Sequence, residues 1–178
     1  MNLHLGCGNK KLPNFVNVDI VKTDVTDIVD DVSTLKSFNN NSVNLIYACH
    51  VLEHFKRKEY KSVLQRWTEL LIPSGILRLS VPDFRKAANL YLKNLYPLNE
   101  LLGFLQGGQT HGYNFHYMNL HFNILENDLR NLGYKNIEIW NWREVSHGNT
   151  DDYSQSYLPH MDKENGELMS LNIQGVKI

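Results

Sequence analysis

Residues 3–9 read LHLGCGN, and this stretch decides the fold that we expect for the chain. A short apolar run leads directly into Gly6-Cys7-Gly8, where glycines let the backbone approach a ligand closely. Residues 15–20 then read as a second strand that carries Asp19 near its C-terminal end. An acid at this place in an open α/β sheet can hydrogen-bond ribose hydroxyls. Together the two features predict a ligand site at the ends of the first two strands.

Length and composition fit one globular domain: 178 residues, of which 42% are hydrophobic and 21% charged. A net charge of −1 gives no bulk attraction to nucleic acid or to anionic membranes. The apolar runs are shorter than the roughly 20 residues of a membrane span, and no leader-like segment opens the chain. We therefore expect a cytoplasmic protein. In this reducing compartment Cys7 and Cys49 should be free thiols. Each follows an expected strand, so both should lie beside one pocket.

Strand-like and helix-like runs alternate over the first two thirds of the chain, which is typical of a largely parallel sheet. The expected strands are residues 3–5, 15–20, 26–32, 43–48, 76–81, 136–142 and 168–178. The expected helices are residues 56–72, 84–95, 98–105 and 121–132, with the first ended by Pro73-Ser74-Gly75. Trp140 and Trp142 would share one face of their strand.

Two connections depart from ordinary lengths. The residues between Asn9 and Phe15 are too few for a normal crossover between parallel strands, so the first helix should be reduced to a turn. The polar stretch 144–167 is longer than most loops. Its apolar residues, among them Tyr153, Tyr157 and Met161, favour an ordered flap over a disordered loop.

Five segments carry a resemblance to a known family: LHLGCG (3–8), VNVD (16–19), DVS (31–33), LIYACHVLEH (45–54) and LRLSVPD (77–83). Their order resembles the class I S-adenosylmethionine-dependent methyltransferases, in particular small bacterial and viral members with unknown acceptors. The resemblance implies an α/β, Rossmann-like, doubly wound sheet of seven strands, mostly parallel with an antiparallel last strand. It also implies a single methyltransferase-like domain over residues 1–178, with S-adenosyl-L-methionine as the cofactor.

The resemblance further implies a cofactor site made of Gly6, Cys7, Gly8, Asp19, Asp31, Val32 and His50. The glycine loop would pass beneath the methionine part, Asp19 would hold the ribose hydroxyls, and Asp31 would accept a hydrogen bond from the adenine amino group. Val32 would pack on the adenine ring and His50 would face the methyl group. His4 and Lys10 depart from the family pattern, since many members have an acid and a third glycine at these positions. The departures concern the methionine end of the site.

The expected reaction is direct methyl transfer to a small-molecule or carbohydrate-like acceptor. A sulfonium is already a strong electrophile, so positioning supplies most of the rate. A base is needed only if the acceptor enters protonated, and a neutral imidazole can take a hydroxyl proton. The candidate catalytic residues are therefore His50, His116 and His111. We expect no nucleic-acid or membrane partner, and the sequence leaves the oligomeric state open.

Two other classes of function remain open. His50-x-x-Glu53-His54 matches the inverted signature of zinc-dependent hydrolases, in which two histidines four residues apart share one face of a helix. The chain could instead be a non-catalytic module that has kept the methyltransferase fold to bind a partner. His111, His116 and His121 recur at intervals of five and so do not share a helix face. On the methyltransferase interpretation we expect no metal.

Overall fold

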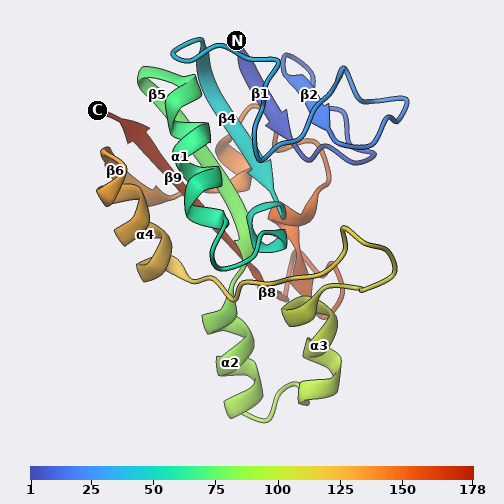
Figure 1. Cartoon of the computed structure of the whole chain (residues 1–178). Coiled ribbons are helices and arrows are strands. Elements are labelled where there is room, and N and C mark those ends of the chain that lie inside the picture. The colour runs from blue at the N-terminus through green and yellow to red at the C-terminus, as the bar shows by residue number, and fades with distance from the viewer.

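The computed structural model describes residues 1–178 and centres on a seven-stranded sheet in the order β3-β2-β1-β4-β5-β9-β6 (Figure 1). The strands are β1 (Asn2–Leu5), β2 (Val16–Asp19), β3 (Ile28–Val29), β4 (Val43–Cys49), β5 (Leu71–Pro82), β6 (Tyr134–Ile139) and β9 (Ser170–Lys177). The first five strands pair in parallel, and β9 runs antiparallel to both β5 and β6. The expected Rossmann-like sheet with an antiparallel last strand is confirmed.

Four α-helices accompany the sheet: α1 (Tyr60–Leu70), α2 (Phe84–Leu92), α3 (Leu98–Gln106) and α4 (Phe122–Asn131). Helices α1 and α4 lie over one face, whereas α2 and α3 form a hairpin beyond the C-terminal end of β5 (Figure 1). No helix is both long enough and apolar enough to cross a membrane. The link between β1 and β2 contains turns and no helix, as its length led us to expect.

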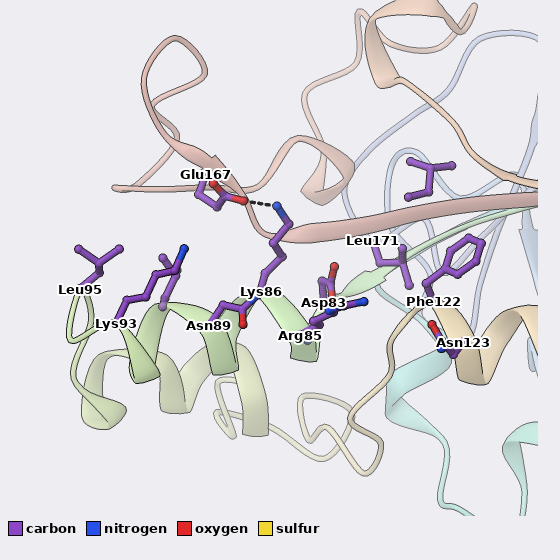
Figure 2. Close-up of a pocket in the computed structure, with 12 residues that line it drawn as sticks. Asp83, Arg85, Lys86, Asn89, Lys93, Leu95, Phe122, Asn123, Glu167 and Leu171 are labelled. Atoms are coloured by element: carbon purple, nitrogen blue, oxygen red, sulfur yellow. Dashed lines mark hydrogen bonds and ion pairs between the residues drawn. The ribbon is translucent and has the colours of Figure 1, made fainter.

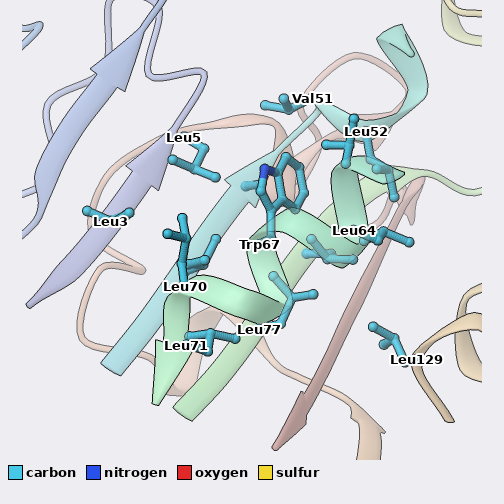
Figure 3. Close-up of a cluster of buried hydrophobic side chains, with 14 of the residues drawn as sticks. Leu3, Leu5, Val51, Leu52, Leu64, Trp67, Leu70, Leu71, Leu77 and Leu129 are labelled. Atoms are coloured by element: carbon cyan, nitrogen blue, oxygen red, sulfur yellow. The ribbon is translucent and has the colours of Figure 1, made fainter. Parts of the chain in front are cut away.

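The face under α1 and α4 holds the main core, a cluster of 25 buried residues (Figure 3). The apolar side of α1 is fully covered, and Trp67 lies at its centre with no exposed surface. The indole Nε1 of Trp67 donates to the carbonyl oxygen of Val32 at 2.7 Å. Burial of such large apolar side chains supplies most of the stabilisation, and the indole bond also fixes the loop that follows β3.

The opposite face is covered by irregular chain. Here Leu12, Tyr47 and Trp140 form a small buried cluster. Residues 140–156 cross this face through the 3₁₀ turns η2 (Trp142–Glu144) and η3 (Tyr153–Gln155). They are attached by hydrogen bonds: the Tyr47 hydroxyl donates to Asp152 Oδ2 at 2.7 Å, and Trp140 Nε1 donates to the carbonyl of Leu79 at 3.0 Å. A segment expected to be a surface flap thus begins as the second layer of the core.

His147 sits in this second layer and is only 3% exposed. Its ring lies 4.2 Å from that of Tyr47 between centroids, and Arg78 Nη1 lies 3.2 Å from its Nε2. Burial, followed by the charge of Arg78, lowers the pKa of His147 to about 4, with Asp152 opposing and His4 adding to the shift. The folded protein therefore holds this imidazole neutral where the unfolded chain would protonate it.

We expect this difference to make the protein less stable in acid. Below about pH 6.5 the unfolded chain binds a proton that the folded chain excludes until about pH 4, so the unfolding free energy falls as pH falls across this window. Across this window, the exclusion of the proton from His147 lowers the free energy of unfolding by about 3 kcal/mol. Urea unfolding of the wild type and His147→Gln between pH 4 and pH 8 should show a difference that is flat above pH 6.5 and changes below it. A pH-independent difference, equal to that of the exposed His160→Gln, would contradict this assignment.

The expected strand 26–32 is much shorter in the structure. Only Ile28 and Val29 of the expected strand 26–32 pair with β2. The acids around them form turns instead: Asp30 Oδ2 accepts from the backbone nitrogen of Ser37, and Asp31 Oδ1 accepts from that of Ser33. Short acidic side chains compete with strand pairing in this way.

The strand expected over 136–142 is displaced to Tyr134–Ile139. Asn136 adopts a φ of 50°, and the register with β9 shifts between Lys135 and Glu138, as at a bulge. The Asn141 side chain then accepts from the backbone nitrogen of Arg143 and starts a 3₁₀ turn. The prediction that Trp140 and Trp142 share a strand face is therefore wrong, although both pack into the cluster of the second face.

Pro73-Ser74-Gly75 does not separate helix α1 from the next strand. The strand β5 begins at Leu71, which pairs with Val43, and Ser74 adopts a φ of 64°. The register between β4 and β5 shifts between Val43 and Leu45. The three residues therefore form an irregularity inside β5, so the predicted start of this strand at Ile76 is five residues late.

Candidate active site

The glycine loop follows β1 and is shaped by its neighbour Val51. Gly6 has a φ of 64°, and a Cβ on it would lie 2.4 Å from Val51 Cγ2. Gly8 has a φ of 53°, but a Cβ there would meet nothing within 4 Å. Gly6 is thus required by packing behind the loop, whereas Gly8 borders open space. Such a loop leaves room on one side for a ligand to contact the backbone.

Asp19 closes the loop at the end of β2. Its Oδ2 accepts from the backbone nitrogen of Gly8 at 2.8 Å, and its Oδ1 accepts from that of Val21 at 2.9 Å. The hydroxyl of Thr23 donates to the carbonyl of Gly8 at 2.9 Å. The half-buried carboxylate therefore holds the second glycine in place, and each oxygen keeps a further lone pair for a ligand.

A cavity of about 370 Å³ opens at the C-terminal ends of β1 and β4. One wall is the glycine loop with Cys7, and a second wall is Cys49 and His50. The third wall comes from the segment 144–167, through Asp151, Asp152, Tyr153 and Met161. The volume is in the range of about 300–1,000 Å³ that small-molecule sites occupy. Both cysteines are free and border this cavity, as expected.

The wall formed by 144–167 was not anticipated residue by residue. A two-stranded sheet of β7 (Tyr157–Leu158) and β8 (Glu167–Leu168) supports it, and Lys163 Nζ donates to Gln155 Oε1 at 2.6 Å. The sequence identified Tyr153 and Met161 as apolar anchors of a flap. It gave no signal that they would reach the ends of β1 and β4, because that contact depends on the path of the chain over the second face.

His50 occupies a constrained position after β4. Its φ is 52°, and its backbone nitrogen donates to the carbonyl of Ser80 at 2.8 Å. The Ser170 hydroxyl gives its proton to the carbonyl of Tyr153 at 2.5 Å, so it can only accept from His50 Nε2 at 2.9 Å. The hydrogen bonds thereby assign the proton to Nε2 and leave a lone pair on Nδ1. Burial lowers the pKa of His50 to about 3.

The Nδ1 of His50 points to Glu53, whose Oε1 lies 3.4 Å away. The Glu53 side chain has no exposed surface, and neither carboxylate oxygen has a hydrogen-bond partner. Burial raises the pKa of Glu53 to about 8. His54 and His116 complete the group, with His116 Nε2 4.0 Å from Glu53 Oε1. Burial lowers the pKa of His116 to about 4.

The inverted hydrolase signature is not helical in this chain. His50 precedes the 3₁₀ turn η1 (Leu52–His54) in a left-handed conformation. The group of side chains close enough to share an ion contains Glu53 and His54 with His116, and does not contain His50. The pair of helical histidines that the hydrolase alternative requires is therefore absent.

The other candidate residues lie outside the cavity wall. Asp31 is exposed, with Oδ1 accepting from the backbone nitrogen and hydroxyl of Ser33. Val32 is half-buried and packs against the main core. Both follow β3, which pairs with β2 next to Asp19. His111 is exposed, and His116 faces Glu53.

A larger cavity of about 660 Å³ lies between α2, the start of α4 and the ends of β6 and β9 (Figure 2). Its rim is charged: Lys86 pairs with Glu167, and Arg85 and Lys93 stand nearby. Neither the glycine loop nor His50 borders it. Strand ends carrying glycines and a nearby acid are the features that position a nucleotide in an open α/β sheet, so the smaller cavity is the candidate active site.

Residues 3–79 match the family model described as a methyltransferase domain. This match covers fewer than half of the chain's residues, and together with the fold it is consistent with the class I S-adenosylmethionine-dependent methyltransferases. S-adenosylmethionine or its product is named for solved methyltransferases that share this fold, and the hydrolase and non-catalytic alternatives are not favoured. No curated relative matches the chain.

Solved structures of methyltransferases share the fold. An S-adenosylmethionine-dependent methyltransferase from Archaeoglobus fulgidus superposes with a TM-score of 0.57 at 12% identity, covering 99% of this chain and 85% of that one. The 1,6-didemethyltoxoflavin-N1-methyltransferase of Burkholderia thailandensis gives 0.58 at 14% identity, covering 99% and 70%. A methyltransferase from Thermotoga maritima gives 0.58 at 13% identity, covering 99% and 82%. At these identities the likeness concerns the fold.

The described residues fit S-adenosylmethionine as a ligand. The open space at Gly8 lies beside a carboxylate with free lone pairs, at the end of the strand next to the glycine loop. The carboxylates of Asp151 and Asp152 border the same cavity, and negative charge there favours a cationic ligand. Lys10 is on the rim as an opposing charge.

Proposed function

We propose that this protein is an S-adenosylmethionine-dependent methyltransferase and that it modifies a small-molecule acceptor, which enters the cavity between the glycine loop and the segment 144–167. The observation that carries this proposal is the third wall, where Tyr153 and Met161 face the ends of β1 and β4. A cavity of about 370 Å³ that is bounded on this side admits a compact acceptor. The Burkholderia thailandensis enzyme, which shares the fold, holds the small molecule 1,6-didemethyltoxoflavin with S-adenosylhomocysteine.

The residues of this chain have separate tasks in the proposed site. Gly6, Cys7 and Gly8 would accommodate the methionine part of the cofactor, and Asp19 would accept hydrogen bonds from the ribose hydroxyls. Asp31 and Val32 would contact the adenine beyond β2, and Trp67 supports them by fixing the Val32 carbonyl. When bound, the cofactor supplies a methyl group on an electrophilic sulfonium. The protein contributes mainly by aligning the acceptor with it.

His50 would border the part of the cavity that holds the methyl group. Neither of its ring nitrogens is free to take a proton from the molecule that is methylated. Its Nε2 is bonded to Ser170, and its Nδ1 faces Glu53, which does not line the cavity. His116 directs Nδ1 to the carbonyl of Phe104 and Nε2 toward Glu53. The proposed acceptor atom therefore has a free lone pair at neutral pH, as a heteroaromatic ring nitrogen or an aromatic amine does. Among the histidines, only a movement of His50 or His116 or an approach of His111 would supply a base for a carbohydrate hydroxyl.

The test is methyl transfer from labelled S-adenosylmethionine to two matched panels of small molecules. One panel contains nitrogen heterocycles and aromatic amines, and the other contains sugars and other neutral alcohols. We expect turnover with members of the first panel, and Tyr153→Ala should raise KM for the acceptor while leaving the Kd of S-adenosylhomocysteine unchanged. Turnover confined to the alcohols would contradict the proposed acceptor class. A loss of cofactor affinity in Tyr153→Ala would place this wall on the cofactor instead.

A further inference from the structure

The group formed by Glu53, His54 and His116 has three potential ligand atoms and lies beside the candidate active site. One ligand atom from each residue lies within 4.8 Å of the others. The Glu53 carboxylate is fully buried and has no hydrogen-bond partner on either oxygen. A buried carboxyl group without a partner is costly whether it keeps or loses its proton, and a cation between the three side chains would give its oxygens a partner.

The hydrogen bonds around the group direct the protons of the neighbouring histidines away from Glu53. The Nδ1 atoms of His54 and His116 each lie 3.0 Å from a backbone carbonyl, those of Phe115 and Phe104 respectively. A carbonyl only accepts, so each Nδ1 carries the proton and donates it outward. In each neutral ring, Nε2 therefore carries a lone pair and no proton. His50 also presents a lone pair on Nδ1 to Glu53, because its Nε2–H is bonded to Ser170.

Metal-binding histidines show the same arrangement, in which the outer ring nitrogen donates to a backbone carbonyl and the inner one binds the ion. The backbone also holds the two sides of the group together. The nitrogen of Tyr117 donates to the carbonyl of Glu53 at 2.8 Å, and the nitrogen of His116 donates to that of Gln106 at 3.0 Å. The loop that carries His116 is thus fixed against η1 independently of any ion, and the ligands are pre-positioned.

We propose that Glu53, His54 and His116 bind one divalent zinc ion. Two imidazoles and a carboxylate suit Zn²⁺, and three protein ligands leave a fourth tetrahedral position. Bond lengths of about 2.0–2.2 Å place tetrahedral ligand atoms roughly 3.4 Å apart, so small side-chain rotations are enough to close the group. The ion would tie the turn after β4 to the loop before α4, directly behind His50. This site differs from the inverted hydrolase motif because His116 replaces His50.

The test uses the full chain, freed of metal by a chelator and then titrated with Zn²⁺ against a chromogenic competitor. We expect one equivalent per chain, with affinity at least 10-fold lower in Glu53→Gln and His116→Gln. His160→Gln removes an exposed histidine outside the group and should bind like the wild type. Circular dichroism of each metal-free variant establishes that it is folded before its affinity is compared.

A second measurement uses only the wild type, in case the buried variants do not fold. Cobalt(II) in place of zinc should give a tetrahedral visible spectrum and two strongly shifted, exchangeable imidazole N–H signals in proton NMR. These signals belong to the outward Nδ1–H groups of His54 and His116. No stoichiometric zinc binding, binding unchanged in folded Glu53→Gln and His116→Gln, or cobalt without the two signals would overturn the proposal. None of these readouts depends on methyl transfer, so they are independent of the proposed acceptor.

Discussion

Gly6→Ala is expected to destabilise the protein by about 2–5 kcal/mol, the larger of two alanine effects in the glycine loop. The new methyl group would lie 2.4 Å from Val51 Cγ2, so either the loop or the start of η1 must move. Forcing extra volume into a packed site costs about 1–3 kcal/mol. The φ of 64° adds about 1–2 kcal/mol for a residue with a Cβ. Urea unfolding monitored by tryptophan fluorescence measures the sum.

Gly8→Ala is the matched control, because it has a similar φ of 53° but no atom within 4 Å of the added Cβ. It should lose only the backbone contribution of about 1–2 kcal/mol. A Gly6→Ala/Val51→Ala double variant should recover part of the loss in Gly6→Ala, which a double-mutant cycle would report as coupling. Equal destabilisation by the two glycine substitutions would show that Val51 does not restrict the loop.

Asp19→Asn is expected to weaken binding of S-adenosylhomocysteine by about 10- to 100-fold. Hydrogen bonds to a charged group contribute about 1.5–3 kcal/mol, and the proposed ribose contacts depend on this carboxylate. The amide also replaces one of the two oxygens that accept from Gly8 and Val21, so it presents an N–H to a backbone donor. Calorimetric titration of folded Asp19→Asn, with the exposed Asp24→Asn as control, measures the change.

The ribose contact can be separated from the support that Asp19 gives to Gly8. An S-adenosylhomocysteine analogue without ribose hydroxyls should bind the wild type more weakly than the parent compound. In Asp19→Asn the two compounds should bind almost equally, because the group that distinguishes them is gone. If the analogue loses the same factor in both proteins, Asp19 acts only by positioning the glycine loop.

Much of the fold could be predicted from the sequence because its signals are local. Apolar residues at helical spacing gave α1, and a nearly continuous apolar run gave the central strand β4. The errors arose where side chains bond to nearby backbone, as Asp30 does with Ser37. The bulge at Asn136 is another such case, because its positive φ depends on how β6 meets β9.

The residues of the candidate site also fall into two groups: those that local sequence motifs predict and those that long-range contacts place. The glycine loop and Asp19 are recognisable because their roles follow from short motifs at strand ends. The approach of His116 to Glu53 could not be read from the sequence, since 62 positions separate them and the loop is placed by backbone bonds to Glu53 and Gln106. The cavity wall at Tyr153 and Met161 likewise depends on long-range packing.

The course of residues 140–156 over the open side of the sheet has a consequence for how such enzymes diversify. One contiguous piece of chain both shields Tyr47 and ends in the wall at Asp152 and Tyr153. The same segment therefore contributes both to the stability of the fold and to the shape of the acceptor site. In proteins whose variable binding loops are attached to a separately folded framework, these two contributions come from different segments. Grafting a foreign loop here must also bring a new partner for the Tyr47 hydroxyl. New acceptors are reached more readily through the tip around Met161, which can vary without uncovering the sheet.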